Sequence, residues 1–139
     1  MNCTTRNFYT EIIQQVILVE RCRHDLNKRL LSSKNRAQKR QLMLSFLCLD
    51  IEKHQLFASA AQVAVQDGDE TVIRRLHNFY RHNAEFDNIV MIIQDEINKT
   101  RKFIHVIQRS LHGWAEMSFA EKRLAQEIEK YIIVRAQQQ

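Results

Sequence analysis

The stretch LHNFYRHNAEFDNIV, residues 76–90, holds two histidines, a glutamate and an aspartate, side chains that can bind a metal ion. In a helix that turns about 100° per residue, His77 and His82 would point about 140° apart, so one ion would not easily reach both. His82 and Glu85 share a face, but two ligands of modest affinity make a weak site. We therefore predict that these histidines flank a packing surface and hold no metal.

A second candidate pair, Asp50 and His54, lies four residues apart on a predicted helix, where a carboxylate and an imidazole project from one face. Bundles that bind di-iron centres use Glu-x-x-His pairs on two helices, and no glutamate in this chain is followed by histidine three residues later. Because His54 is near a predicted apolar face, we predict a core histidine bonded to a neighbouring carboxylate.

Other sequence patterns that mark chemistry are missing. The chain contains no HExxH, no P-loop and no dinucleotide-binding fingerprint. Its cysteines, Cys3, Cys22 and Cys48, form no CxxC pair. Cys48 lies in an apolar run, where a thiol is more often a small core residue than an activated nucleophile. We therefore predict a protein that is not an enzyme and that uses no cofactor.

The elements that must position these residues are helices. The 139-residue chain has no proline and only two glycines, Gly68 and Gly113, whereas a β protein of this size needs many turn residues. The sequence therefore predicts an all-α protein. Hydrophobic spacing and breaker residues place four helices, at about residues 7–31, 33–66, 69–112 and 118–136.

Local signals mark the ends of these helices. Ser32 or Ser33 can cap the second helix. Gly68 can take the left-handed conformation that ends it, and the aspartate that follows can accept backbone N–H bonds at the next helix start. The sequence SFAE forms a capping-box pattern in which Ser118 and Glu121 satisfy each other's backbone donors and open the fourth helix.

The third predicted helix carries the clearest periodicity in the chain. Mostly apolar residues recur at heptad spacing over nearly six heptads, which predicts one continuous packing seam. The first set of seam positions is Leu76, Asn83, Val90, Ile97, Ile104 and Leu111, and the second is Phe79, Phe86, Ile93, Thr100, Ile107 and Trp114.

These helices predict an elongated antiparallel four-helix bundle with a long central helical hairpin, formed by the second and third helices, in a single domain over residues 1–139. At about 1.5 Å per residue, the third helix would be about 60 Å long, against about 35 Å and 30 Å for the first and fourth. Because shorter helices cannot fully cover such a hairpin, we expect self-association or a groove for another helix.

The second predicted helix contains the segment LMLSFLCLDI, residues 42–51, which is apolar around nearly its whole circumference. A helix that is apolar all round must be buried on all sides. Residues such as Leu47 are assigned to the core of the chain itself, whereas Leu42, Phe46 and Leu49 provide further apolar surface. We predict that this further surface binds a partner protein or a second copy of the chain.

Charge is distributed unevenly along the chain. Residues 26–49 include six cationic side chains and no acidic one, whereas residues 50–70 sum to −4. An antiparallel hairpin would place the cationic segment beside the basic end of the third helix and create a basic pole. Cations at a helix start oppose the helix dipole at a cost of about 0.3–1 kcal/mol each. Their presence predicts an acidic partner for Lys34, Arg36, Lys39 and Arg40.

The sequence thus favours a helical protein-binding module, such as an adaptor, a secretion-type chaperone or an inhibitor. A nucleic-acid-binding regulator that uses the basic pole is the alternative. The first twenty residues lack the pattern of a secretory signal, and no apolar run approaches the length that spans a bilayer. With an odd number of cysteines, these features lead us to expect a cytoplasmic protein.

Overall fold

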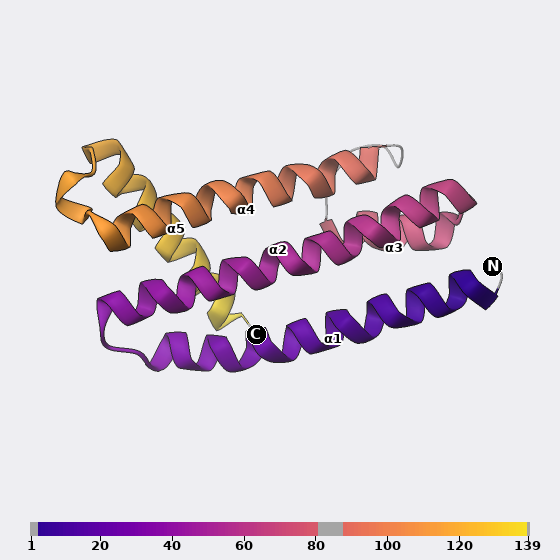
Figure 1. The fold of residues 1–139 in the computed structure, drawn as a ribbon, viewed down its shortest axis with the longest axis horizontal. Helices are drawn as coiled ribbons and strands as arrows, with labels where there is room; N and C mark the ends of the chain where they lie inside the picture. The colour runs from indigo at the N-terminus through magenta and orange to yellow at the C-terminus, as the bar shows by residue number, and fades with distance from the viewer. Residues whose placement is uncertain (1–2, 81–87, 139) are drawn as a thin grey trace. The chain divides into compact units, whose positions relative to one another are not determined.

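The structure, a computed structural model, describes residues 3–80 and 88–138. These residues form α-helices and short 3-10 segments and contain no strand, which confirms the predicted all-α class (Figure 1). The elements in chain order are α1 (Cys3–Ser32), α2 (Arg36–Asp67), α3 (Glu70–Tyr80), α4 (Ile89–His112), η2 (Trp114–Glu116) and α5 (Phe119–Gln137). None of these helices is both long and apolar enough to cross a bilayer.

The cap at the start of α2 differs from the predicted one. The backbone N–H of Gln38 donates to Asn35 Oδ1 at 3.0 Å, so an asparagine side chain satisfies one of the donors that a helix start leaves open. Ser32 is still part of α1, and the hydroxyl of Ser33 donates to the side chain of Gln38. The prediction of a serine cap is therefore wrong. Ser32 belongs to α1, and Asn35 caps α2 in place of a serine.

Two other helix ends follow their sequence signals. Gly68 has a positive φ of 69° after α2, a conformation that glycine adopts without steric strain. Asp69 Oδ1 then accepts the N–H of Val72 at 3.2 Å, as expected for a helix start. Ser118 and Glu121 form the predicted capping box at the start of α5. Short-range chemistry thus determines these ends.

The region predicted as one long helix contains two described helices, α3 and α4. The seam positions Asn83 and Phe86 lie outside the described residues, so a continuous seam through them stays a prediction. Within α4 the expected period is visible, because Ile93, Ile97 and Ile107 are buried. Trp114 does not continue the seam, since α4 ends at His112 and Trp114 begins η2.

The contacts within the chain divide into two compact units. Unit 1 comprises residues 1–19 and 52–98, and unit 2 comprises residues 20–51 and 99–139. Helices α1, α2 and α4 each contribute one part to both units. Each unit has its own hydrophobic cluster. The single domain over residues 1–139 stays a prediction.

The core of unit 2 receives side chains from α1, α2, α4 and α5. Its buried members are Leu30, Leu42, Met43, Phe46, Leu47, Ile107, Ile128, Ile132 and Ala136. Near this core, Arg40 at the start of α2 donates to the carbonyl of Ser110 at the end of α4, as an antiparallel pair of helices requires. The complete arrangement as a four-helix bundle stays a prediction.

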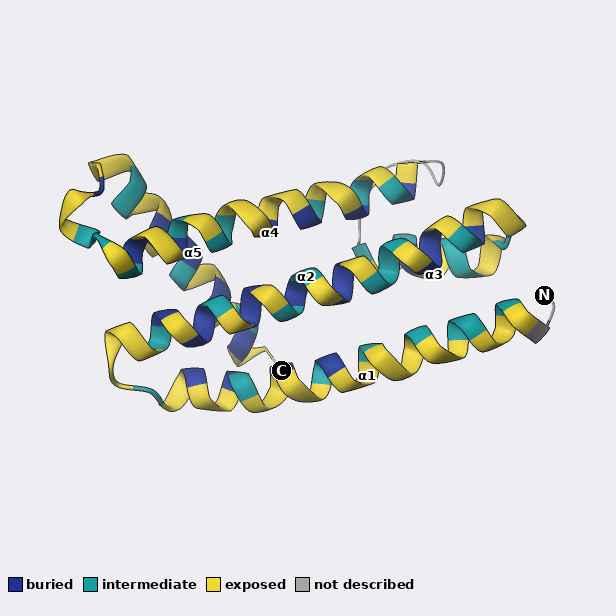
Figure 2. Cartoon of the chain, viewed as in Figure 1, coloured by how far each residue is buried: buried dark blue, intermediate teal, exposed yellow. Residues whose placement is uncertain are grey.

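The core of unit 1 is built from smaller residues. Its buried members are Ala60, Ala61, Leu76, Ile89, Ile93 and Ile97, from α2, α3 and α4. The contribution of α1 consists of partly buried side chains, among them Tyr9 and Ile12. Figure 2 shows the N-terminal part of α1 coloured mainly as intermediate (teal) and exposed (yellow) residues. One side of this core is therefore incompletely covered.

Candidate partner-binding groove and basic cavity

An apolar groove of about 540 Å³ lies on unit 1 between α1, α2 and α3. Its lining residues are Arg6, Tyr9, Thr10, Ile12, Ile13, Val16, Ile17, Phe57, Ala60, Val72, Arg75, Leu76 and Phe79. Among the described residues that line the groove, most are aliphatic or aromatic and only two, both arginines, are charged. A concave apolar surface with few polar groups is the usual form of a binding site.

The groove leaves large apolar side chains in contact with solvent. Ile13 is 59% exposed, Ile17 46% and Phe79 47%. Ile13 and Ile17 are one helical turn apart on α1, so they present adjacent apolar surface along one wall. Single exposed apolar residues are common, but several that line one groove mark an interaction site.

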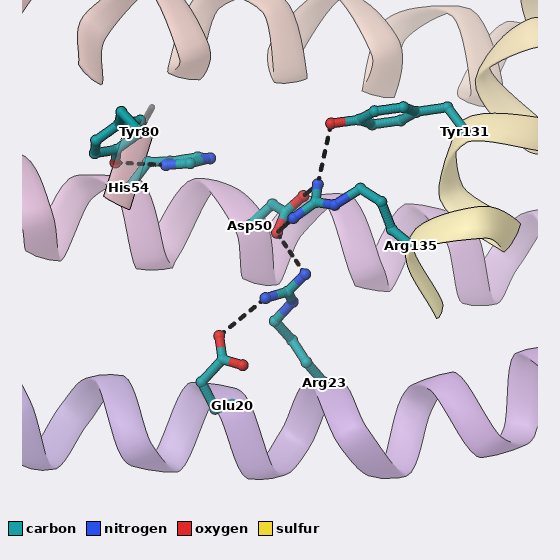
Figure 3. A network of polar contacts seen from close by, with 7 residues as sticks. All are labelled: Glu20, Arg23, Asp50, His54, Tyr80, Tyr131 and Arg135. Atoms are coloured by element: carbon teal, nitrogen blue, oxygen red, sulfur yellow. Dashed lines mark hydrogen bonds and ion pairs between the residues drawn. The ribbon is translucent and has the colours of Figure 1, made fainter. Parts of the chain in front are cut away.

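Aromatic contacts fix the opposite wall, where α3 packs against α2. The rings of Phe57 and Phe79 meet edge to face with centroids 4.7 Å apart, and Lys53 Nζ lies 4.7 Å from the Phe79 ring centroid. Nearby, His54 Nδ1 and the Tyr80 hydroxyl are hydrogen-bonded at 2.7 Å (Figure 3). These contacts hold Phe79 in place although half of its surface is exposed.

The structure confirms one part of the prediction for His54, because its side chain is buried, as expected for a core histidine. Its Nδ1 is hydrogen-bonded to Tyr80 on α3, and Asp50 binds two arginines. A bond between His54 and a neighbouring carboxylate stays a prediction. Four residues along a helix bring two side chains to one face, yet a partner from another helix can compete for each of them. His82 and Glu85 lie outside the described residues.

Tyr9 lies at one end of the groove with an unusual environment. Its hydroxyl oxygen is buried and has no hydrogen-bond partner among the described residues. Burial, together with the carboxylates of Asp69 and Asp67, raises the pKa of Tyr9. The phenol is therefore neutral at physiological pH. The same groove is lined by Arg6 and Arg75, which are exposed and form no ion pair with any described residue.

Unit 2 contains a buried ionic network centred on Asp50. Arg23 Nη2 from α1 lies 3.1 Å from Asp50 Oδ1, and Arg135 Nη1 from α5 donates to Asp50 Oδ2 at 2.6 Å (Figure 3). The side chains of Arg23 and Asp50 are only 1% and 2% exposed. Glu20 accepts a further hydrogen bond from Arg23 at 2.9 Å. One carboxylate thus links three helices.

The network also packs on an aromatic ring. The guanidinium carbons of Arg23 and Arg135 lie 4.8 Å and 5.5 Å from the ring centroid of Phe46, which suits cation–π contact. Burial disfavours the charge of Arg135, but Asp50 and Tyr131 together outweigh it and hold the pKa of Arg135 above its ordinary value. Arg135 therefore stays charged although most of its side chain is buried.

A second, smaller cavity of about 250 Å³ lies on unit 2. It is lined by the four cations that the sequence singled out, Lys34, Arg36, Lys39 and Arg40, together with Met43, Glu129 and Ile133. Lys34 and Arg36 are exposed and Lys39 is half-buried. The four cations are close in sequence, in the turn before α2 and in the first turns of α2, and α5 supplies Glu129 and Ile133 to the same depression.

Arg40 differs from the other three cations because it is buried and fully engaged. Its Nε donates to Glu129 Oε1 at 2.9 Å, its Nη1 donates to the carbonyl of Ser110 at 3.3 Å, and its guanidinium lies 4.6 Å from the Trp114 ring centroid. Arg40 therefore supports the floor of the cavity, while Lys34 and Arg36 are available to a ligand.

The predicted apolar partner surface is corrected by the structure. Phe46 and Leu42 are buried in the core of unit 2, and Leu49 is half-buried. The sequence correctly indicated that this segment must be covered, but α1, α4 and α5 of the same chain provide side chains to the core around it. Phe46 and Leu42 are therefore not available as a surface for a partner.

The cysteine prediction also needs correction. Cys48, expected in the core, is an exposed free thiol, and Cys22 is exposed as well. The helix that carries Cys48 is apolar on most sides, but its buried faces are occupied by neighbours such as Leu47. Within the described residues, no group of three or more histidine, cysteine or acidic side chains is placed to hold a metal ion.

Two features of the sites were missed by sequence reasoning. Arg23 falls between Val19 and Leu30 at spacings of four and seven residues, so an arginine in line with buried positions was a visible signal. The exposure of Ile13 and Ile17 had no such signal, because it depends on which helices cover α1.

Comparisons with family models, curated proteins and solved structures gave no match to this chain. Function is therefore inferred from the geometry.

Proposed function

We propose that this chain is a non-enzymatic helical protein-binding module that takes an amphipathic helix of a partner protein into the groove of unit 1. The observation that carries the proposal is the exposure of Ile13, Ile17 and Phe79 around one apolar groove. Roles as an adaptor, a chaperone or an inhibitor all use this kind of contact. The site replaces Phe46 and Leu42, whose burial removes them from the surface.

A helix suits the groove better than an extended peptide. All of its walls are helices, so no strand edge offers the row of backbone groups that an added strand requires among the described residues. A helical ligand presents apolar side chains one turn apart, which matches the spacing of Ile13 and Ile17. Arg6 and Arg75 add positive charge, so acidic residues beside the apolar stripe of the ligand are favoured.

Binding can be tested with synthetic amphipathic helices that carry a leucine stripe. One peptide has glutamates beside the stripe, a second has lysines there, and a third has the glutamates with alanines in place of the leucines. Fluorescence anisotropy of labelled peptides measures the affinity for the full chain. We expect the leucine–glutamate peptide to bind best and the alanine peptide to bind at least about tenfold more weakly, a difference equivalent to about 1.4 kcal/mol.

Matched variants locate the binding site. Ile13→Asp with Ile17→Asp places two charges in the groove, whereas Leu18→Asp with Val65→Asp places two on exposed apolar residues that do not line it. We expect the first pair to abolish binding and the second to leave it unchanged. Equal effects of the two pairs would overturn the proposal. Self-association of the wild-type chain that only the first pair abolishes would also overturn it, because the occupant would then be a second copy.

A further inference from the structure

The two units of the chain carry opposite formal charge. Unit 2 has sixteen lysines and arginines and seven acidic residues, a formal net charge of +9, whereas unit 1 has a formal net charge of −4. The moderate value of +5 for the whole chain conceals this difference. An excess of this size on one compact unit predicts binding to polyanions.

Most cations of unit 2 are not neutralised within the unit. Five of its acidic residues are held in ion pairs with five arginines. The remaining eleven cations form no ion pair with any described residue. They are Arg21, Lys28, Arg29, Lys34, Arg36, Lys39, Lys99, Arg101, Lys102, Lys122 and Lys130. The positive charge is therefore largely available to an external ligand.

Three of these eleven cations, which are close in sequence, line one cavity. Lys34, Arg36 and Lys39 line the basic cavity, whose volume of about 250 Å³ leaves room for an anionic group. The carboxylate of Glu129 also lines the cavity, but it is already engaged by Arg40 at 2.9 Å. The three unpaired cations therefore dominate the charge that a ligand in the cavity would meet.

We infer that unit 2 binds the phosphate backbone of a nucleic acid, with Lys34, Arg36 and Lys39 around a phosphate group in the basic cavity. This site is separate from the apolar groove and does not depend on it. A nucleic acid is a regular polyanion, with one charge per about 1.7 Å of axis in duplex DNA. It can therefore engage many separated cations at once, which suits eleven unpaired cations distributed over α1, α2, α4, α5 and the turn between α1 and α2.

The residues of the cavity fit a bilayer less well. Its apolar members are Met43, which is buried, and Ile133, which is half-buried. Stable binding to a membrane surface usually combines cations with exposed apolar side chains that insert between lipids. The cavity offers cations without such side chains. An acidic protein would supply fewer and less regular charges than a phosphate backbone.

The test uses labelled oligonucleotides of about 20 nucleotides, single-stranded and duplex, with the full chain at salt concentrations from about 50 mM to about 200 mM. One triple variant carries Lys34→Gln, Arg36→Gln and Lys39→Gln. The matched control carries Arg101→Gln, Lys102→Gln and Lys130→Gln, which removes the same charge from exposed residues outside the cavity. Circular dichroism checks that both variants remain helical.

We expect wild-type affinity to fall steeply as salt rises, because phosphate binding releases counterions. The cavity variant should bind at least about tenfold more weakly at low salt and lose about one unit of salt slope per removed contact. The control variant should lose clearly less affinity for the oligonucleotides than the cavity variant. Equal losses in the two variants, or no binding at low salt, would overturn the inference. Tighter binding to vesicles rich in phosphatidylserine or to polyglutamate, with the same loss in the cavity variant, would instead assign the cavity to a membrane or an acidic protein.

Discussion

The apolar groove of unit 1 and the ionic network of unit 2 treat apolar and charged side chains in opposite ways. Unit 2 encloses Arg23 and Asp50 inside its helices, whereas unit 1 leaves Ile13, Ile17 and Phe79 in contact with solvent. Helix α1 contains both cases, because Ile17 and Arg23 are only six residues apart. The difference shows that the hydrophobicity of a helix segment does not by itself decide whether the segment is buried. Burial also depends on which other helices are available to cover that segment.

The two arrangements also have different consequences for stability and binding. Buried charges are stable only while every partner is present, so the network in unit 2 is sensitive to the loss of one group. An open apolar groove is the opposite case, since truncating a side chain there removes little burial within the chain. We therefore expect mutations in unit 2 to affect folding and mutations in the groove to affect binding.

The largest effect is expected from Asp50→Asn, which removes the negative charge between two arginines. Breaking a buried ion pair by changing one partner costs about 3–5 kcal/mol, because the other charge remains buried without compensation. Urea unfolding followed by circular dichroism measures the change in the free energy of unfolding. Asp25→Asn, at an exposed position of the same helical region as Arg23, is the control and should change little. A loss below about 1 kcal/mol for Asp50→Asn would show that the arginines are solvated in solution.

The second prediction compares an aromatic residue in each unit. Phe46→Ala in unit 2 should cost about 3–5 kcal/mol, because it creates a cavity in a fully enclosed core. Phe79→Ala in the groove of unit 1 should cost only about 1 kcal/mol, since half of that ring is already exposed. The same unfolding measurement applies to both. Similar losses at the two positions would contradict the description of unit 1 as open.

Much of the fold was predictable because its signals are local. The capping box of Ser118 and Glu121 and the glycine turn at Gly68 involve residues within a few positions of each other. The period of α4 also predicted its buried positions, such as Ile93 and Ile97. Helix class, several helix ends and part of one core face therefore follow from the order of residues.

The sites were less predictable, because they depend on contacts between distant segments. Phe46 was expected at a partner surface, since nothing in its own helix indicates that α5 supplies core residues beside it. Arg40 was expected to be free like Lys34, but Glu129 and Ser110, far along the chain, engage it. Ile13 is the opposite case, a large aliphatic residue that is exposed because no other helix covers it.

A smaller effect is expected at the start of α5 in unit 2. Ser118→Ala removes the hydroxyl that accepts the N–H of Glu121 at 3.2 Å, and loss of such a cap costs about 0.5–2 kcal/mol. Ser118→Asn, which can still cap, should retain most of the stability. Thermal unfolding of the two variants separates the loss of the cap from general effects of substitution. Equal destabilisation by alanine and asparagine would argue against a contribution from the cap.

The same cap predicts a pH dependence. The hydrogen bond from the backbone of Ser118, and then its side-chain bond and the charge of Arg109, lower the pKa of Glu121. A lowered pKa in the folded state means that this contribution to stability is present above the unfolded pKa of about 4.3 and is lost as pH falls through the folded value. Glu121→Gln should therefore flatten the decline in stability at acidic pH. An unchanged acid limb in that variant would assign the decline to other carboxylates.

The smallest expected effect has the opposite sign and concerns unit 1. Because the buried hydroxyl of Tyr9 has no hydrogen-bond partner among the described residues, Tyr9→Phe should leave the chain equally stable or up to about 1 kcal/mol more stable.

The raised pKa of Tyr9 adds a second readout, the dependence of stability on alkaline pH. The unfolded phenol ionises near pH 10 while the folded one resists ionisation, so the wild-type chain should lose stability as pH rises above about 10. Tyr9→Phe should lack this alkaline loss, whereas Tyr131→Phe in unit 2 should keep it. Urea unfolding at neutral and alkaline pH measures both effects, and a destabilised Tyr9→Phe chain would reveal that the hydroxyl does find a partner in solution.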